Sequence, residues 1–168
     1  MPGRIHWVER IEKGMLGILP HPRGGPWLRY DIADWRAQKA DAIVSLLTPS
    51  EMAELELEQE AAVCAEYGIQ YQSFPIPDHS VPPLDRATLS FLRTLFQTLT
   101  DGHCVLIHCR FAIGRSALVA ASLLVLGGMA PDRAFERIGV ARGCPVPDTA
   151  EQREWVQHFA EEIARGAV

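Results

Sequence analysis

His108-Cys109-Arg110-Phe111-Ala112-Ile113-Gly114-Arg115-Ser116 lies between two apolar runs of the chain. The run Val105–Ile107 before it predicts a buried strand, and the run Ala117–Leu126 after it predicts a helix. A loop between a strand and a helix directs several backbone N–H groups and the positive end of the helix dipole at one point. The sequence therefore predicts an anion site that a phosphate would fit. The same field favours the thiolate form of Cys109, so the predicted site contains its own nucleophile.

Five residues separate Cys109 from Arg115, and His108, Gly114 and Ser116 occupy the flanking positions. This pattern resembles the motif of the cysteine-dependent protein tyrosine and dual-specificity phosphatases, in particular their compact, kinase-associated branch. The resemblance implies hydrolysis of phosphate monoesters on protein through a phosphocysteine intermediate, with neither a metal nor a cofactor. It also implies that the phosphate-binding loop consists of Arg110, Phe111, Ala112, Ile113, Gly114 and Arg115.

Two residues of the loop depart from the family pattern. Ala112 stands where most members have glycine, and glycine reaches positive φ at no steric cost, whereas alanine does not. Phe111 is bulkier than the small residue often found there. A phosphate-binding module without turnover is therefore one alternative. A structural, buried Cys109 is a second alternative, and a rhodanese-like sulfurtransferase, whose loop is usually one residue shorter, is a third.

A thiolate that attacks phosphorus expels a poor leaving group, so the reaction needs a general acid. The run Pro75-Ile76-Pro77-Asp78 resembles the acid loop of the dual-specificity branch, which makes Asp78 the predicted acid and the residue that later activates water. The alternative is that Asp78 only stabilises a turn at His79 and Ser80. Asp85 and His79 are the second choices for the acid, although Asp85 also suits the start of the following helix.

Other residues receive supporting roles. The planar fork of Arg115 suits two phosphoryl oxygens, which a lysine cannot bind in the same way. Ser116 is expected to donate a hydrogen bond to the sulfur of Cys109 when it leaves. His108 is expected to orient the loop through backbone carbonyls and not to act as a base.

The segment Arg142–Gln152 resembles the phosphatase segment that brings a glutamine toward the hydrolytic water, and Gln152 matches that glutamine. The alternative is that Gln152 belongs to the first turn of an ordinary surface helix.

Periodicity and turn residues predict the remaining elements. The predicted strands are Ile5–Val8, Met15–Leu19, Ala42–Leu47, Ile69–Phe74 and Cys104–His108. The predicted helices are Tyr30–Lys39, Pro49–Tyr67 with Thr48 and Glu51 as a capping box, a helix of about 15 residues through Leu89–Leu99, Pro131–Ile138, and Asp148–Arg165 with Asp148 and Glu151 at its start. We therefore expect one α/β domain over residues 1–168. Its central sheet should be mostly parallel and flanked by helices, the first two strands should form a hairpin, and the active-site loop should follow a central strand.

The composition limits the possible partners. The chain has 168 residues, 48% of them hydrophobic, and a net charge of −5, which gives no general attraction to nucleic acid or to an anionic membrane. No apolar run approaches the roughly 20 residues of a membrane span. The start of the chain lacks an apolar signal segment, and Cys64, Cys104 and Cys144 show no paired or metal-like spacing, so a cytoplasmic location is expected.

The expected partners are a phosphorylated protein or peptide, with tyrosine phosphate first, and phosphate or another oxyanion in the loop. A phosphoinositide phosphatase is the competing enzyme. Lipid-directed members commonly carry extra lysines in the loop, whereas this loop offers only Arg110 besides Arg115.

Overall fold

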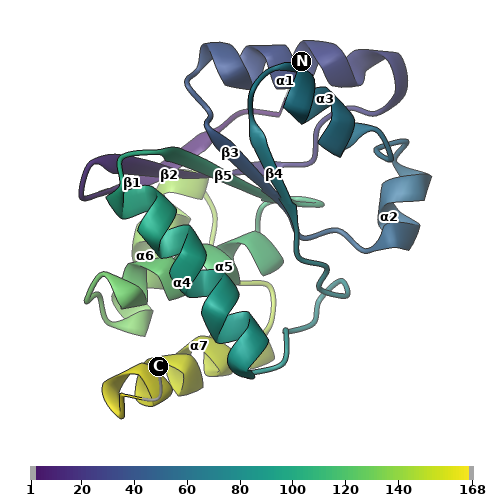
Figure 1. Cartoon of the computed structure of the whole chain (residues 1–168). Helices are drawn as coiled ribbons and strands as arrows, with labels where there is room; N and C mark the ends of the chain where they lie inside the picture. Colours follow the sequence, from purple (N-terminus) through teal and green to yellow (C-terminus); the bar gives the residue numbers. More distant parts are fainter. Residues whose placement is uncertain (1–2, 167–168) are drawn as a thin grey trace.

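The computed structural model describes residues 3–166, and its central feature is a mixed sheet (Figure 1). Within those residues the sheet has five strands in the order β1-β2-β5-β3-β4. The strands are β1 (His6–Ile11), β2 (Gly14–Pro20), β3 (Ala42–Ser45), β4 (Gln70–Ser73) and β5 (Cys104–Cys109). Strands β1 and β2 form the expected antiparallel hairpin, and every other pairing is parallel. The expected mostly parallel sheet with a central active-site strand is confirmed.

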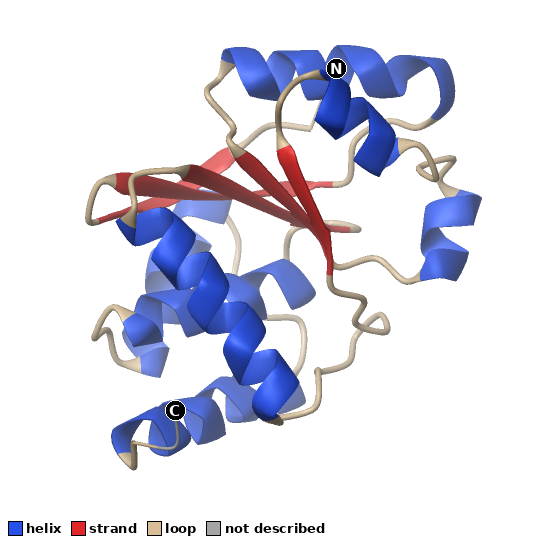
Figure 2. Ribbon diagram, in the orientation of Figure 1, coloured by secondary structure: helices blue, strands red, loops and turns tan. Residues whose placement is uncertain are grey.

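Helices cover both faces of the sheet (Figure 2). In chain order they are the short 3-10 helix η1 (Gly25–Trp27), α1 (Leu28–Ala37), α2 (Pro49–Glu54), α3 (Glu60–Glu66), α4 (Arg86–Thr100), α5 (Arg115–Leu126), α6 (Pro131–Arg142) and α7 (Ala150–Ala164). Residues of α1 and α3 share one apolar core with one face of the sheet, and residues of α4 to α7 share a second core with the other face. The α/β class expected from the sequence is confirmed.

Strand β5 and helix α5 form the centre of the molecule. All six residues of β5 are buried, as expected for a parallel strand with helices on both faces. Helix α5 is apolar on nearly all sides, which is typical of a helix that is buried all round. It contacts β5, α4, α6 and α7. This packing fixes the first residue of α5 next to the carboxyl end of β5.

The single helix expected over Pro49–Tyr67 is wrong, because the chain leaves the helix between α2 and α3. The capping box at its start is confirmed: Thr48 Oγ1 accepts from Glu51 N at 3.3 Å, and Thr48 N donates to Glu51 Oε2 at 2.9 Å. Beyond α2, Glu56 has a φ of +55°, and the side chain of Leu57 is fully buried. Burial of Leu57 in the core next to α1 overrides the helical pattern of the sequence.

The start expected for the last helix is wrong by one residue. Its N-cap is Thr149 and not Asp148, and Gln152, not Glu151, completes the capping box. Thr149 Oγ1 accepts from Gln152 N at 3.1 Å, and Gln152 Oε1 accepts from Thr149 N at 3.2 Å. Asp148 with Glu151 and Thr149 with Gln152 have the same spacing, so the spacing rule alone does not distinguish the two starts.

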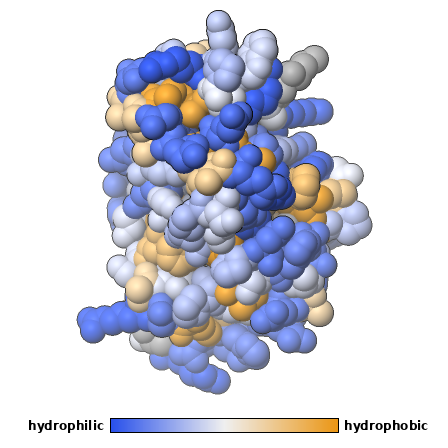
Figure 3. All heavy atoms as spheres, turned by 90° about the vertical axis from the view of Figure 1, so that its right-hand side faces the viewer, coloured by the Kyte–Doolittle hydropathy of each residue, from blue (hydrophilic) through white to orange (hydrophobic). Residues whose placement is uncertain are grey.

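The surface on the α2 side of the molecule is mainly hydrophilic, with apolar side chains in small separate patches (Figure 3). None of the helices between residues 3 and 166 is long and apolar enough to cross a membrane.

The break between α2 and α3 generates a stability prediction. A Cβ atom added at Gly24 would lie 1.9 Å from Leu55 O and 2.7 Å from Glu56 O, both backbone atoms of the break. We expect Gly24→Ala to lower the free energy of unfolding by about 1–3 kcal/mol, the usual cost of forcing atoms into a packed site. Urea unfolding of the two proteins measures the change. An unaltered midpoint would contradict the prediction, because it would mean that the backbone at Leu55 and Glu56 can move away from the added methyl group without cost.

Candidate active site

The active-site loop joins β5 to α5, as the sequence predicted. Strand β5 ends at Cys109, and Gly114 is the N-cap of α5. A Cβ atom at Gly114 would lie 2.7 Å from Asp148 Oδ2 and 2.9 Å from Gln152 Nε2, so a side chain there would displace these two side chains at the start of α7. The free backbone N–H groups of the first turn of α5 and the helix dipole therefore act on the segment that begins with Cys109.

Cys109 is 3% exposed and receives a hydrogen bond from a neighbouring hydroxyl. Ser116 Oγ donates to Cys109 Sγ at a distance of 2.8 Å. The donor comes from the first turn of α5, one helical position after Arg115. A hydroxyl that donates to sulfur stabilises a thiolate. The geometry therefore matches the arrangement expected for Ser116.

Arg115 is 1% exposed, and its guanidinium contacts three other segments. Nη1 donates to Ile76 O and to Glu51 Oε2, both at 2.8 Å, and Nη2 donates to Glu51 Oε1 at 2.9 Å. Burial lowers the pKa of the guanidinium, but its hydrogen bonds to Glu51 and the nearby charges of Cys109 and Asp78 outweigh burial, so the pKa is raised. Arg115 is a permanent cation in this site.

Glu51 is a site residue that the sequence analysis treated only as a helix cap. Its side chain closes the capping box of α2 and binds Arg115 with both oxygens. Burial raises the pKa of this carboxyl, but the hydrogen bonds from Arg115 and Thr48 more than reverse that effect and lower it to about 2. A buried arginine requires a carboxylate partner. Because Arg115 was expected to lie in the anion site, this requirement could have shown that an acidic residue such as Glu51 must pair with it.

Asp78 lies in a turn and also reaches the active-site loop. The turn is closed by Ser80 N, which donates to Pro77 O at 3.0 Å, and His79 N donates to Asp78 Oδ1 at 3.0 Å. Asp78 Oδ1 is 3.1 Å from Arg115 Nη2. Asp78 therefore lies in the turn and also beside Arg115, and its role as the acid stays a prediction.

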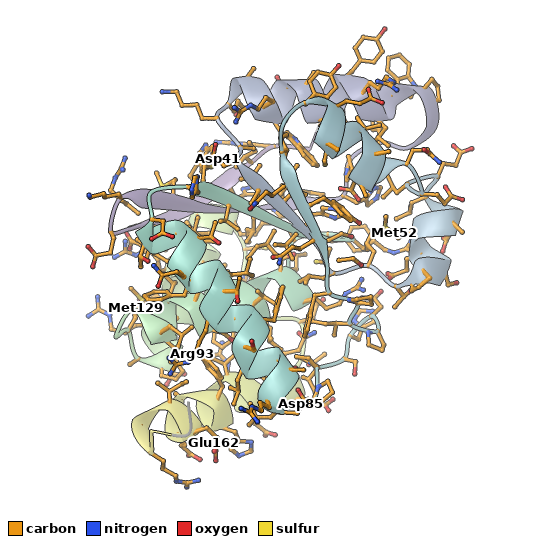
Figure 4. All side chains as sticks on the ribbon, viewed as in Figure 1. Asp41, Met52, Asp85, Arg93, Met129 and Glu162 are labelled. Carbon is orange, nitrogen blue, oxygen red and sulfur yellow. The ribbon has the colours of Figure 1, made fainter. Side chains whose placement is uncertain are left out.

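Asp85 and His79, the second choices for the acid, differ in position. Asp85, labelled in Figure 4, is the N-cap of α4, and its Oδ1 accepts from Thr88 N at 2.9 Å. That backbone hydrogen bond keeps the pKa of Asp85 below its ordinary value, which disfavours the protonated form that an acid needs. His79 has a φ of +59°, and its ring nitrogens lie 3.6 Å from Asp78 Oδ2 and 3.8 Å from Asp148 Oδ2.

Ala112 adopts the left-handed conformation that the family's glycine would allow. Its φ is +58°, a conformation that costs an L-residue roughly 1–2 kcal/mol. Arg142, from the end of α6, donates from Nε to Ala112 O and from Nη2 to Phe111 O, each at 3.2 Å. These two charged hydrogen bonds are of the size needed to offset that cost. The sequence analysis did not single out the side chain of Arg142, since its contact spans 30 positions of the chain.

His108 is fully buried and does not follow the expectation of backbone contacts. Its Nε2 lies 2.7 Å from Glu60 Oε1, and no described residue hydrogen-bonds to its Nδ1. Glu60, also fully buried, comes from α3 on the other side of the helix break. The prediction of backbone carbonyl partners is therefore wrong, because the chain provides a carboxylate at that position. Glu60 is a second residue that the sequence analysis missed.

The remaining loop residues face outward or into the core. Arg110 is held by α2, with Nη2 donating to Glu54 Oε2 at 3.0 Å and Nε donating to Glu51 Oε1 at 3.4 Å. Phe111 is 61% exposed on the rim of the loop, and Ile113 is half-buried against the core.

Gln152 lies against the loop beside Gly114, but both ends of its amide have protein partners. Oε1 accepts from Thr149 N, and Nε2 donates to Ser80 O at 3.2 Å. The role of orienting water stays a prediction. Across residues 3–166 no group of three or more His, Cys, Asp or Glu side chains is arranged to hold a metal ion. Cys64 and Cys104 are buried and Cys144 is half-buried, all three as free thiols.

Known proteins are similar to this chain in sequence or in fold. Cyclin-dependent kinase inhibitor 3 of Rattus norvegicus is 24% identical over 139 residues, which are 82% of this chain and 65% of the relative. The chain thus spans just under two thirds of that relative's length. A crystal structure of kinase associated phosphatase, with its catalytic cysteine replaced by serine, superposes with a TM-score of 0.88 over 98% of this chain and 97% of that one, at 22% identity. PTPMT1 in complex with PI(5)P superposes with a TM-score of 0.68 over 95% and 98%, also at 22% identity.

At these identities the two crystal structures show the fold alone. The family is shown by the sequence itself. A family model described as "Polymorphic toxin system, DSP-PTPase phosphatase" matches residues 26–129, more than half of the chain. The chain belongs to this family of DSP-PTPase phosphatases.

Proposed function

We propose that the protein hydrolyses phosphate monoesters on proteins or peptides, phosphotyrosine first and phosphoserine or phosphothreonine second, through a phosphocysteine intermediate. One observation carries the proposal. Arg115, at the end of the active-site loop (residues 109–115, called the Cys109 loop below), lies 3.1 Å from Asp78, so the proposed nucleophile, cation and acid meet at one edge of the sheet. The hydrogen bond from Ser116 to the sulfur supports the same chemistry.

In the first step the thiolate of Cys109 attacks phosphorus, an S–P bond forms and the ester O–P bond breaks. Asp78 gives its proton to the departing oxygen, which would otherwise be a poor leaving group. Of the N–H groups of Arg115, the two on Nη1 are used by Ile76 O and Glu51, and one on Nη2 is used by Glu51. Nε is left for one phosphoryl oxygen, and the second Nη2 hydrogen, which lies 3.1 Å from Asp78 Oδ1, becomes available for another when Asp78 turns to the leaving-group oxygen.

In the second step the carboxylate of Asp78 takes a proton from water, and the water oxygen attacks phosphorus. The S–P bond breaks, inorganic phosphate forms and the thiolate of Cys109 returns. Ser116 Oγ, 2.8 Å from the sulfur, stabilises the negative charge as it reappears there. No step needs a metal or a redox cofactor.

The rim of the loop supports a protein substrate over a phosphoinositide. Arg110 is engaged by Glu54 and Glu51, so it offers little free positive charge to further phosphate groups on an inositol ring. Phe111, 61% exposed, offers an aromatic face to the ring of a phosphotyrosine. The intact Cys109 and Ser116 pair argues against a binding module without turnover.

The proposal predicts the behaviour of Cys109→Ser. Hydrolysis of a phosphotyrosine peptide should fall to background, because a hydroxyl is a far weaker nucleophile than a thiolate in this site. Binding of inorganic phosphate and the circular dichroism spectrum should change little. Initial rates on phosphotyrosine peptide, phosphoserine peptide and PI(5)P vesicles, measured side by side for both proteins, test the proposal, and a rate that survives the substitution or is highest on PI(5)P contradicts it.

The acid role predicts a leaving-group effect for Asp78→Asn. We expect kcat on phenyl phosphate to fall by about 10²–10⁴-fold, the usual size of an acid–base contribution, with a much smaller change in KM. The loss on p-nitrophenyl phosphate should be much smaller, since its acidic phenol leaves without a proton. The high-pH limb of kcat should also disappear in the variant. If Asp78→Asn keeps both the kcat on phenyl phosphate and the high-pH limb, Asp78 is not the acid, and His79 or Asp85 becomes the candidate.

The ion pair of Arg115 predicts a pH-dependent contribution to stability from Glu51. Because its folded pKa, about 2, lies below the ordinary 4.5, its ionised form stabilises the fold above pH 4.5, and this contribution is lost as the pH falls toward 2. At pH 7 Glu51→Gln should lower the free energy of unfolding by about 1.5–3 kcal/mol, and the difference from wild type should shrink below pH 4.5. Urea unfolding between pH 7 and pH 2.5 measures it.

The matched control for this measurement is Glu54→Gln. Glu54 is on the same helix and pairs with Arg110, but its side chain is 64% exposed, so its loss should have little effect at any pH. Equal effects of the two substitutions would contradict the special role of Glu51.

A further inference from the structure

The segment that carries Asp78, residues 75–83 between β4 and α4, is called the acid loop below. Its first part is fixed to the sheet and to the active-site arginine. Ile76 N donates to Leu46 O at 3.0 Å, and Ile76 O accepts from Arg115 Nη1 at 2.8 Å. The side chain of Ile76 is fully buried. These contacts place the beginning of the acid loop beside the Cys109 loop.

The second part of the acid loop is held by side chains of α7. Ser80 O accepts from Gln152 Nε2 at 3.2 Å, and Pro82 O accepts from Trp155 Nε1 at 2.8 Å. Gln152 and Trp155 are three positions apart, so they lie on the same face of the helix. Figure 1 shows the connection from β4 to α4 passing close to the start of α7. The acid loop is thus clamped between the sheet and α7, with Asp78 between the two attachments.

The chemistry of the acid loop makes these two donors important. Pro75, Pro77, Pro82 and Pro83 have no backbone N–H, so the loop is rich in acceptors and poor in donors. It has no regular secondary structure that would pair its own carbonyls. Carbonyls in a site of this kind need donors from elsewhere. Both donors are in buried side chains, since Gln152 is fully buried and Trp155 is 7% exposed.

We propose that Trp155 and Gln152 are positioning residues for the general acid: through Pro82 O and Ser80 O they hold the acid loop in place, with Asp78 beside Arg115. This inference rests on the proposed function, because it assigns the cause of the acid's position in that reaction. It gives the buried amide of Gln152 a task in both half-reactions, since Asp78 must stay in place first as an acid and then as a base.

The test is the leaving-group dependence of Trp155→Phe. Phenylalanine keeps an aromatic ring next to Phe159, on which Trp155 stacks at 5.6 Å, but it lacks the N–H that binds Pro82 O. We expect kcat on phenyl phosphate to fall about tenfold, the size of one lost hydrogen bond, and kcat on p-nitrophenyl phosphate to fall less than about twofold. Inhibition by orthovanadate, which reports on the Cys109 loop, should be unchanged.

A second variant tests the other contact without disturbing the start of α7. Gln152→Glu keeps the oxygen that accepts from Thr149 N but loses the amide that donates to Ser80 O. The same selective loss on phenyl phosphate is expected. In an Asp78→Asn background neither variant should reduce the rate further, because the acid that they position is already absent.

Val156→Ala is the matched control, because Val156 is a fully buried neighbour on α7 whose side chain has no donor. It should affect both substrates equally. Equal losses on both substrates in Trp155→Phe, or a further loss in the Asp78→Asn background, would overturn the inference. Hydrogen exchange gives a readout that needs no turnover: amides of residues 76–81 should exchange faster in Trp155→Phe than in Val156→Ala. The two proposals can also be separated. If the amides exchange faster in Trp155→Phe but the wild-type protein shows no hydrolysis that depends on Cys109, the proposed function is rejected, whereas the attachment of the acid loop to α7 is supported.

Discussion

The buried charge of Arg115 is the interaction on which the active-site architecture depends. A guanidinium that is 1% exposed must have its hydrogen bonds satisfied within the protein, and here the partners come from α2 through Glu51 and from the acid loop through Ile76 O. Arg115 itself is the first residue of α5. One side chain therefore ties together the helix after β3, the loop after β4 and the helix after β5. The position of the predicted acid and the shape of the anion site follow from the same set of contacts.

The central part of the fold could be predicted from the sequence because its signals are local. An apolar strand, a loop of fixed length and an apolar helix specify β5 and α5, whatever the rest of the chain does. The region between α2 and α3 could not be predicted in this way. Its residues are good helix formers, and only the burial of Leu57 and the contact of Gly25 N with Glu56 O, at 3.0 Å, explain the break. Such contacts between distant segments leave no periodic pattern.

The residues of the candidate active site also fall into two groups, those with a local sequence signal and those without one. Cys109, Arg115 and Asp78 stand out through motif spacing and proline-rich context, and they lie at one edge of the sheet. Glu60 and Arg142 have no motif of their own, since each meets the Cys109 loop through a contact that spans dozens of positions. The rule that buried charges and buried polar groups need partners could have indicated that such residues exist. The sequence states that a partner must exist but not which residue it is.

The hydrogen bond from Trp155 to Pro82 O has a consequence for the protein during its synthesis. The strands of the sheet and helix α5 all precede α7 in the chain, so their core can begin to assemble on the ribosome before α7 has emerged. The acid loop cannot take its final place until α7 packs beneath it, because its second attachment belongs to that helix. On the proposed mechanism, a nascent chain would have the thiol of Cys109 before it has a positioned acid, and it would bind a phosphate ester before it could cleave it.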